Sequence, residues 1–305
     1  MNELPPTSLS IAVVERETRL SKDVLRAWEK RYGFPTPERD ANGERCYPAW
    51  QVERLHLMRR LMEQGYRPGQ LAVLSTEELA ALPKRGALLC PVPDRRHDAS
   101  AIERLLATVK DNPAGFGRSM QRELSREGLE RFVKHIAAPL TAAVGQRWED
   151  GTFEVFDEHL YTEETTRVLR QAIGALPAAG GAPRILLTTL PGESHGLGLL
   201  MAEALLALDG AACLSLGTET PLLDIARGAA AFGSGIVALS FSAAYPRRQI
   251  GSALRQLRLA LPPGTALWAG GAGIASQAAI EGVRFLASLD DARHALDDWR
   301  AERNA

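Results

Sequence analysis

The chain is short of cysteine, of net charge and of long apolar runs, and each shortage excludes a class of protein. Three widely separated cysteines, Cys46, Cys90 and Cys213, indicate neither a disulfide framework nor a zinc finger, and favour a reducing compartment. A net charge of −1 gives no overall attraction to nucleic acid, so such binding needs a local patch. No run approaches the roughly eighteen apolar residues of a membrane span, and residues 1–10 contain no apolar signal segment. We therefore expect a cytoplasmic protein without a membrane partner.

The composition is that of an ordinary globular protein, with 45% apolar and 24% charged residues. A length of 305 residues allows about two or three domains. The pattern predicts a multidomain α and α/β chain: a winged helix-turn-helix at 8–76, a linker at 77–97, a four-helix bundle at 98–178, a doubly wound parallel sheet of Rossmann-like type at 182–291 and a C-terminal tail at 292–305.

Apolar runs alternate with helical patterns in the last large block. The predicted strands are Arg184–Thr189, Ala211–Leu216, Gly235–Ser240, Ala266–Ala269 and Gly282–Leu286, with helices beginning near Gly196, Leu222, Arg247 and Ala275. This alternation is typical of a parallel sheet with helices on both faces. A ligand site is expected at the carboxyl ends of the strands.

One such end carries an acid and an imidazole. The run Leu190-Pro191-Gly192-Glu193-Ser194-His195-Gly196-Leu197-Gly198 follows the first predicted strand and enters a glycine-rich helix start. A carboxylate there can accept the second N–H of the imidazole and fix its tautomer, as it does for metal-bound histidines. A histidine that only satisfies or caps the loop is the alternative interpretation.

Two further motifs follow this loop at characteristic intervals. Residues 199–239 separate Gly198 from Ser240-Phe241-Ser242, and residues 243–269 lead to Gly270-Gly271. Together they resemble the cobalamin-binding fold of methionine synthase and the mutases. The resemblance implies that His195 is the lower axial cobalt ligand and Glu193 its partner. Residues implied to line the pocket for the nucleotide tail are Gly198, Ser240, Ser242, Gly270 and Gly271. Glu193 replaces the commoner Asp, and Ser242 stands where Leu is usual.

The first block reads as two short helices, a hairpin and a longer helix. Ser10 can cap the first helix and Ser21 the second, which carries Lys22, Arg26 and Lys30 at i, i+4 spacing. This stripe suits DNA phosphates, and a solvated charged face is the alternative. Pro48 is predicted to open the longer helix, with Val52, Leu55, Met58 and Leu61 at core spacing.

The residues from Arg26 to Pro37, with Arg39, Gly43, Arg45 and Tyr47, resemble the winged-helix signature of the MerR family. The resemblance implies contact with double-stranded operator DNA, and it implies that Trp28 packs in the core. The DNA-binding positions implied by it are Lys22, Arg26, Arg31, Tyr32, Arg39, Arg45 and Tyr47. The long coiled coil and effector cysteines of typical MerR activators are missing, which argues against metal sensing.

Residues 98–177 are predicted to form helices starting near Ile102, Leu129, Pro139 and His159. Trp148 stands near a helix end, and residues 149–157 separate it from Glu158-His159. Core packing of the Trp and a solvated polar face are the alternatives for these residues. Before a cobalamin domain, the motif resembles the CarH/LitR-type light-sensing repressors. In that family Trp148 would shield the 5′-deoxyadenosyl group of adenosylcobalamin, and Glu158 and His159 would bind the adenosine.

The family pattern predicts a cytoplasmic repressor, not an enzyme, whose dark dimer or tetramer binds operator DNA and is released by light. One departure concerns Glu149, because a His follows the Trp in the studied family members. Imidazole is the better cobalt ligand, so the illuminated state is expected to lack a second imidazole. A light-independent regulator responding to another cobalamin form, a tetrapyrrole or a protein antagonist is the alternative. A cobalamin-dependent enzyme would need a large substrate domain, for which no segment is long enough.

Overall fold

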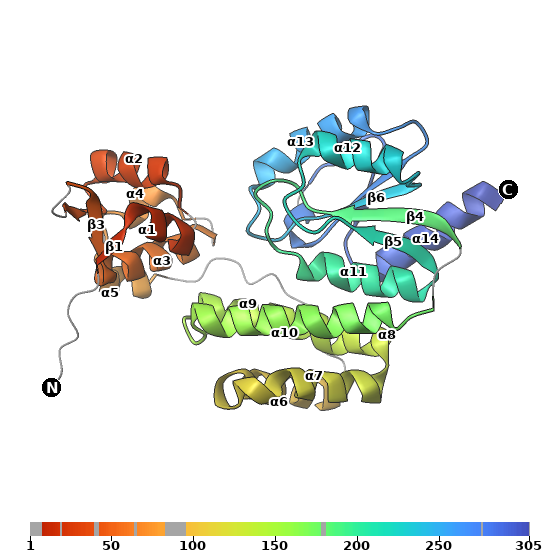
Figure 1. Ribbon diagram of the computed structural model, residues 1–305, viewed down its shortest axis with the longest axis horizontal. Helices are drawn as coiled ribbons and strands as arrows, with labels where there is room; N and C mark the ends of the chain where they lie inside the picture. Colours follow the sequence, from red (N-terminus) through yellow and green to blue (C-terminus); the bar gives the residue numbers. More distant parts are fainter. Residues whose placement is uncertain are drawn as a thin grey trace. The chain divides into compact units, whose positions relative to one another are not determined.

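Figure 1 shows a computed structural model of the protein. The structure describes residues 8–18, 20–39, 43–63, 66–82, 96–177, 181–275 and 277–304. The chain folds into two compact units, Met1–Ala87 and Leu88–Ala305. None of the helices in the described ranges combines the length and the apolar character needed to cross a membrane.

The first unit is the predicted winged helix-turn-helix. Its elements are β1 (Ser8–Ser10), α1 (Ile11–Thr18), α2 (Lys22–Tyr32), β2 (Glu38–Arg39), β3 (Arg45–Pro48), α3 (Ala49–Glu63), α4 (Pro68–Leu71) and α5 (Thr76–Ala80). Ser21 caps α2 by accepting a hydrogen bond from the Val24 N–H. The wing strands β2 and β3 pair antiparallel, and β1, which the sequence pattern did not reveal, pairs with the other side of β3.

The first unit extends beyond the predicted boundary at residue 76. The N–H of Glu78 donates to the Ser75 hydroxyl, while the Ser75 N–H donates to the Glu78 carboxylate, and this capping box starts α5. Leu79 is fully buried with the core residues of α3. The prediction that the linker begins at residue 77 is therefore wrong. Residues 83–95 of the predicted linker lie outside the described residues.

The second unit begins with the predicted four-helix bundle. Its helical segments are α6 (Arg96–Asp111), α7 (Pro113–Glu127), α8 (Leu129–Arg131), η1 (Phe132–Ala137), α9 (Ala138–Glu149) and α10 (Val155–Gly174). α8, η1 and α9 run on as one helix, so the prediction of a new helix at Pro139 is wrong. A proline inside an α-helix clashes with the carbonyl four residues earlier. The wider π-helical turn of η1 directly before it lets the helix continue.

The predicted parallel sheet follows, with helices on both faces (Figure 1). Its elements are β4 (Gly181–Thr188), α11 (Leu197–Leu208), β5 (Ala211–Ser215), α12 (Leu222–Ala231), β6 (Ile236–Ser240), α13 (Arg247–Ala260), β7 (Ala266–Gly270), η2 (Ala272–Ile274), β8 (Val283–Leu286) and α14 (Leu289–Asn304). The strand order is β5-β4-β6-β7-β8, so the order reverses between β4 and β6. Such a switch point opens a crevice at the strand ends.

Side chains of β4 alternate between two cores. Leu186 packs with α12 and α13, whereas Ile185 and Leu187 pack with α11 and α14. The opposite side of α11 faces the bundle, where Leu200, Met201 and Ala204 join the bundle core. α11 is therefore sandwiched between the sheet and α10, and it fixes the bundle on this face of the sheet.

Two further predictions in this unit are wrong. Residues 292–304 of the predicted C-terminal tail belong to α14, which buries Ala295, Leu296 and Trp299 against the sheet. Their i, i+1, i+4 spacing forms one apolar stripe on a helix. The predicted helix near Ala275 is replaced by the short 3-10 turn η2 and an irregular connection to β8 in the described residues. Instead of the predicted helix, α14 packs against the sheet.

Candidate functional site

The loops after β4 and β6 meet at the switch point, and their side chains form one hydrogen-bonded cluster. His195 Nδ1 lies 2.7 Å from Glu193 Oε1, and the backbone N–H of His195 donates to the same oxygen at 3.0 Å. Ser242 donates its N–H (2.7 Å) and its hydroxyl (2.8 Å) to Glu193 Oε2. The Ser242 hydroxyl is also 3.1 Å from His195 Nδ1. The predicted pair of Glu193 and His195 is thus formed, with Ser242 as a third member.

Burial and hydrogen bonding act in opposite directions on Glu193. The side chain is 1% exposed, and burial raises the pKa of its carboxyl. Hydrogen bonds from the His195 ring and from the backbone of Ser242 and His195 outweigh burial, so this pKa lies below the ordinary 4.5. An ionised carboxylate only accepts hydrogen bonds, so His195 Nδ1 carries the proton. Nε2 is then the ring nitrogen with a lone pair for a metal.

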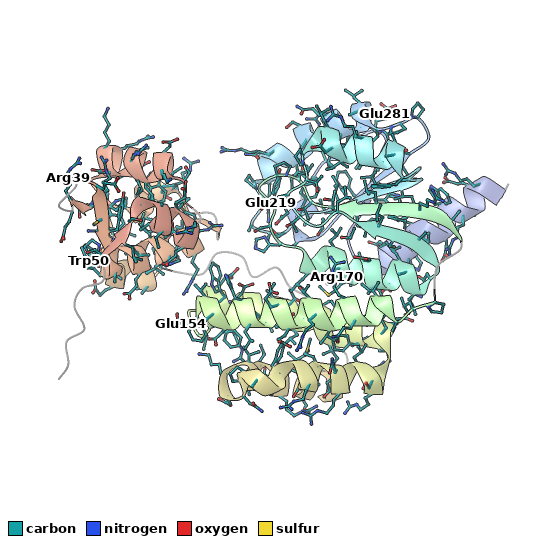
Figure 2. The ribbon with its side chains drawn as sticks, viewed as in Figure 1. Arg39, Trp50, Glu154, Arg170, Glu219 and Glu281 are labelled. Atoms are coloured by element: carbon teal, nitrogen blue, oxygen red, sulfur yellow. The ribbon has the colours of Figure 1, made fainter. Side chains whose placement is uncertain are left out.

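The loop around Glu193 is held by residues that the sequence analysis did not single out. The buried Thr189 hydroxyl donates to the Glu193 carbonyl at 2.5 Å and accepts the Glu219 N–H at 2.8 Å. The Glu219 carboxylate in turn accepts the Gly192 N–H at 3.2 Å. Figure 2 labels Glu219 among the loops at this end of the sheet. Threonines ending a buried strand are the signal that could have identified this support.

The glycines predicted to line a nucleotide tail lie beside the same loops, but part of their role is structural. A Cβ on Gly198 would meet the Ser240 hydroxyl at 3.4 Å, an ordinary contact. A Cβ on Gly271, whose φ is +95°, would lie 2.4 Å from the Phe241 carbonyl oxygen. Glycine at 271 is therefore required by the packing of the chain itself, and Gly270 precedes it at the end of β7.

The donor set fits a metal that a macrocycle already holds. Among the described residues, no three His, Cys, Asp or Glu side chains gather so as to hold an ion by themselves. A metal inside a macrocycle needs only one axial ligand from the protein. The His195 side chain is 51% exposed while the carboxylate behind it is buried, which is the arrangement of a metal-binding histidine and its partner.

The predicted capping residues lie at one end of the bundle. Trp148 is half-buried near the end of α9, and Glu158 and His159 occupy the first turns of α10. Glu158 accepts a hydrogen bond from the Thr162 hydroxyl and lies 2.8 Å from His159 Nδ1. α10 packs along α11, the helix that begins directly after His195. The bundle and the His195 loop therefore belong to one packed body.

In the first unit, the predicted DNA-binding cations lie on α2 and on the wing. Lys22, Arg26 and Arg31 are on α2, where Lys22 pairs with Glu15 and Arg26 with Asp23, both at 3.5 Å. Arg45 of the wing forms two hydrogen bonds to Glu29 of α2, the shorter at 2.9 Å. This pair fixes the wing against α2, a role of Glu29 that the sequence analysis missed. Arg39, labelled in Figure 2, is exposed on the other wing strand.

The two tyrosines of the predicted DNA interface are placed differently from the cations. Tyr47 is fully buried in the core of the first unit, so DNA contact by its side chain is wrong for this structure. In the register of the small sheet, Tyr47 of β3 lies opposite Leu9 of β1, and both side chains contact the core of the first unit. Tyr32 is half-buried, edge-on to Trp28. Trp28 packs in the core as predicted.

Comparison with known proteins supports both halves of this description. Residues 9–77 match the family model of MerR HTH regulatory proteins. The HTH-type transcriptional repressor CarH of Myxococcus xanthus is 32% identical over 261 residues, covering 85% of this chain and 87% of that protein. The repressor CarA of the same organism is 30% identical over 263 residues, covering 84% of each chain.

A solved structure shares the fold of the second unit. The monomethylamine corrinoid protein of Methanosarcina barkeri superimposes with a TM-score of 0.54 at 16% identity, covering 66% of this chain and 99% of that chain. At this identity the likeness shows the fold alone: a helical bundle followed by a Rossmann-like domain. The chain therefore belongs to the MerR-type family of HTH transcriptional repressors that includes CarH and CarA, a family of regulators rather than enzymes.

Proposed function

We propose that this protein is an adenosylcobalamin-binding, light-responsive repressor whose dark oligomer binds operator DNA. The observation that carries the proposal is the pairing of His195 with the buried Glu193 carboxylate at the switch point of the sheet, next to a helical bundle. When bound, the corrinoid would supply a cobalt–carbon bond that light can break. The residues of the protein would bind the corrinoid, cover the adenosyl group, and shift when the bond is broken.

His195 would be the lower axial ligand, held in one tautomer by Glu193 and Ser242. Gly198, Ser240, Ser242, Gly270 and Gly271 would line the pocket for the nucleotide tail. On the other side, Trp148 would cover the adenosyl group with its apolar ring, and Glu158 and His159 would hydrogen-bond the adenosine. The contact of Glu158 with Thr162 and His159 keeps these polar groups ordered at the start of α10.

The element with two arrangements would be the interface between α10 of the bundle and α11 of the sheet domain. The adenosyl group under Trp148 would favour the dark arrangement, and its loss would allow the bundle to shift. A dimer or tetramer would place several DNA-binding units on adjacent sites and gain avidity. Lys22, Arg26, Arg31, Tyr32, Arg39 and Arg45 would contact the operator.

The test is to load the purified protein with adenosylcobalamin in darkness, then measure its absorbance spectrum and its mass by light scattering before and after green light. A bound cofactor whose spectrum changes while the mass falls supports the proposal. His195→Ala should lose cofactor binding with an unchanged circular dichroism spectrum. His294→Ala, which removes an exposed histidine of α14, is the matched control. Equal binding by His195→Ala and the control would contradict the ligand assignment.

Glu149 favours a second candidate, a cobalamin-binding repressor that does not respond to light. It follows Trp148 at the end of α9 and is half-buried. A carboxylate is a weaker cobalt ligand than imidazole, so the state after illumination would have less to stabilise it. Cofactor binding without any change of mass in light would support this candidate. Absence of binding would contradict both.

A further inference from the structure

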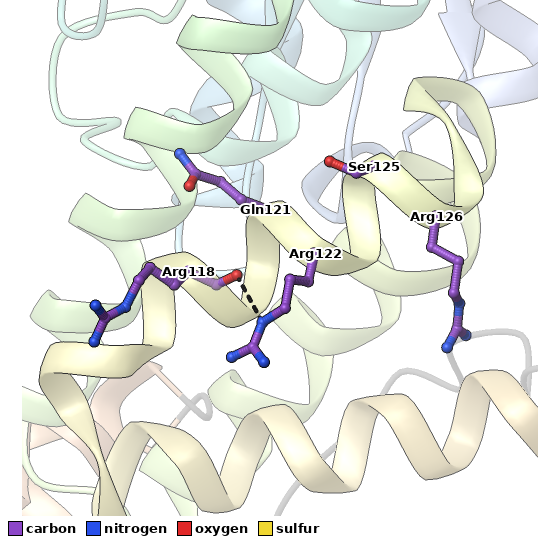
Figure 3. Close-up of a pocket in the computed structure, with 5 residues that line it drawn as sticks. All are labelled: Arg118, Gln121, Arg122, Ser125 and Arg126. Atoms are coloured by element: carbon purple, nitrogen blue, oxygen red, sulfur yellow. Dashed lines mark hydrogen bonds between the residues drawn. The ribbon is translucent and has the colours of Figure 1, made fainter.

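The outer face of α7 is a row of arginines that neither proposed site uses. Phe116 and Met120 are fully buried and attach one side of the helix to the bundle core. Arg118, Arg122 and Arg126 follow one another at i, i+4 spacing on the opposite, exposed side. Successive Cα atoms in such a row are about 6 Å apart along the helix axis. Figure 3 shows the three side chains extending from consecutive turns of the helix.

Nearby acids neutralise only the Arg126 end of this row. Glu123 and Glu127, the two carboxylates of α7, are each 14% exposed. Glu123 already pairs with Arg104 and Arg126, and Glu127 with Arg126 and Arg131. The hydrogen bond from Arg131 is the main reason why the pKa of Glu127 lies below its ordinary value, so this carboxyl stays ionised. Of the three arginines in the row, Arg126 alone pairs with these two acids, whose other partners are Arg104 and Arg131.

Arg118 and Arg122 have no carboxylate within ion-pair distance among the described residues. The Arg122 guanidinium donates only within α7, to the Arg118 carbonyl and, at 3.2 Å, to the Ser119 hydroxyl. These two cations project into water above a helix whose own acids are occupied. They can exchange their present contacts for an external anion at little cost, because no buried ion pair is broken.

The surface along this row is open and lined by polar groups. Arg118, Gln121, Arg122, Ser125 and Arg126 line a shallow hollow of about 770 Å³ on the surface of the helix (Figure 3). All five side chains end in polar groups, and three of these groups are guanidinium cations. Arginines, glutamine and serine are the donors with which proteins bind the phosphates of DNA.

We propose that this basic face, defined as Arg118, Arg122 and Arg126 of α7, binds the phosphate backbone of double-stranded DNA. Charge complementarity and the membership of the chain in a family of DNA-binding repressors favour DNA over other polyanions. A duplex held by the winged helix of the same chain would be present at high effective concentration. Contacts of this kind add affinity without sequence preference.

The experiment compares Arg118→Ala/Arg122→Ala with the unchanged full-length chain. Both positions are exposed on a helix, where alanine is well tolerated, so the variant should fold normally. Binding to a fluorescein-labelled duplex of mixed sequence, several helical turns long, is measured by anisotropy over a range of salt concentrations. Loss of two phosphate contacts should make the negative slope of log K against log salt shallower by about 1.8.

Arg227→Ala/Arg255→Ala, on exposed positions of α12 and α13, changes the net charge by the same amount and is the matched control. Its salt slope should equal that of the unchanged chain. An equal slope for the α7 variant and this control would overturn the proposal. A lower oligomer mass of the α7 variant with an unchanged slope would also overturn it, because the face would then bind a second copy of the chain. Since no cofactor is added, failure of cobalamin binding leaves this test unaffected.

Discussion

Glu193 and His195 are joined twice through a single oxygen: Glu193 Oε1 accepts from the backbone N–H of His195 and lies 2.7 Å from its ring Nδ1. The two contacts fix both the position of the loop and the rotation of the imidazole. Because the second carboxylate oxygen is bound by Ser242, the acid cannot turn away from the ring without breaking four hydrogen bonds. The carboxylate therefore connects the loop after β4 to the loop after β6.

Glu193→Gln should weaken cobalamin binding about 10- to 100-fold, the usual effect of changing the partner of a metal-bound histidine. An amide can donate to Nδ1 as well as accept from it, so it no longer enforces one tautomer. A spectroscopic titration with cobalamin measures the affinity. Glu281→Gln, at an exposed position labelled in Figure 2, is the matched control. Identical affinities for the two variants would show that the tautomer is set by another group.

Trp148→Ala should still bind cobalamin but fail to form the dark oligomer, because the proposed lower ligand His195 would be intact while the proposed cover over the adenosyl group would be lost. Light-scattering mass in darkness, measured with saturating adenosylcobalamin, checks this expectation. Trp148→Phe keeps an aromatic surface and should restore much of the dark mass. A full dark oligomer formed by Trp148→Ala would remove the capping role.

Tyr47→Phe distinguishes the sequence-based expectation from the structure. The Tyr47 hydroxyl is buried without a hydrogen-bond partner, and burial raises its pKa above the ordinary 10. Removing a buried unsatisfied hydroxyl should leave stability unchanged or raise it by about 1 kcal/mol, while DNA affinity stays the same. Thermal unfolding and anisotropy measure the two quantities. A clear loss of DNA affinity would support the DNA contact of Tyr47 that the family signature implied.

The burial of Glu203 predicts how the free energy of unfolding depends on pH. This carboxyl lies on α11, 8% exposed, and its nearest cation is Arg170 Nη1 of α10 at 3.8 Å; Figure 2 labels Arg170 between the two helices. Burial raises the pKa of Glu203 above 4.5, and Arg170 lowers it in part. A raised folded-state pKa means that the unfolded chain releases this proton first. Ionisation therefore costs stability, and the cost appears as the pH rises through the folded-state pKa.

Glu203→Gln should accordingly unfold at a higher temperature than the unchanged chain at pH 7, by a few degrees, and the difference should vanish as the pH falls towards 4.5. Thermal unfolding followed by circular dichroism at several pH values measures this. Glu281→Gln again serves as the control and should show no such convergence. An advantage of Glu203→Gln that grows in acid would reverse the sign of the argument.

Local patterns were enough to predict most elements of both units. Apolar runs and turn residues located β4 to β8 within a few residues, and Ser21 marked the start of α2. Two of the errors arose where a distant partner decides the structure. The residues of α14 looked like a tail until the sheet provided the surface that buries Trp299. The side chain of Tyr47 matched a DNA-contact motif, but the core of the first unit encloses it.

What the sequence by itself determined is the chemistry at each position: an acid and an imidazole in one loop, a serine and glycines in two others, and cations on one helix. Periodicity and turn residues are local properties, so they can be read along the chain. Only the tertiary structure decided which loops meet. The strand order β5-β4-β6 brings Ser242 to Glu193, and packing on α11 brings the bundle beside His195. Those contacts join residues far apart in sequence. They form because elements from different segments bury apolar surface against one another, which no single segment can do alone.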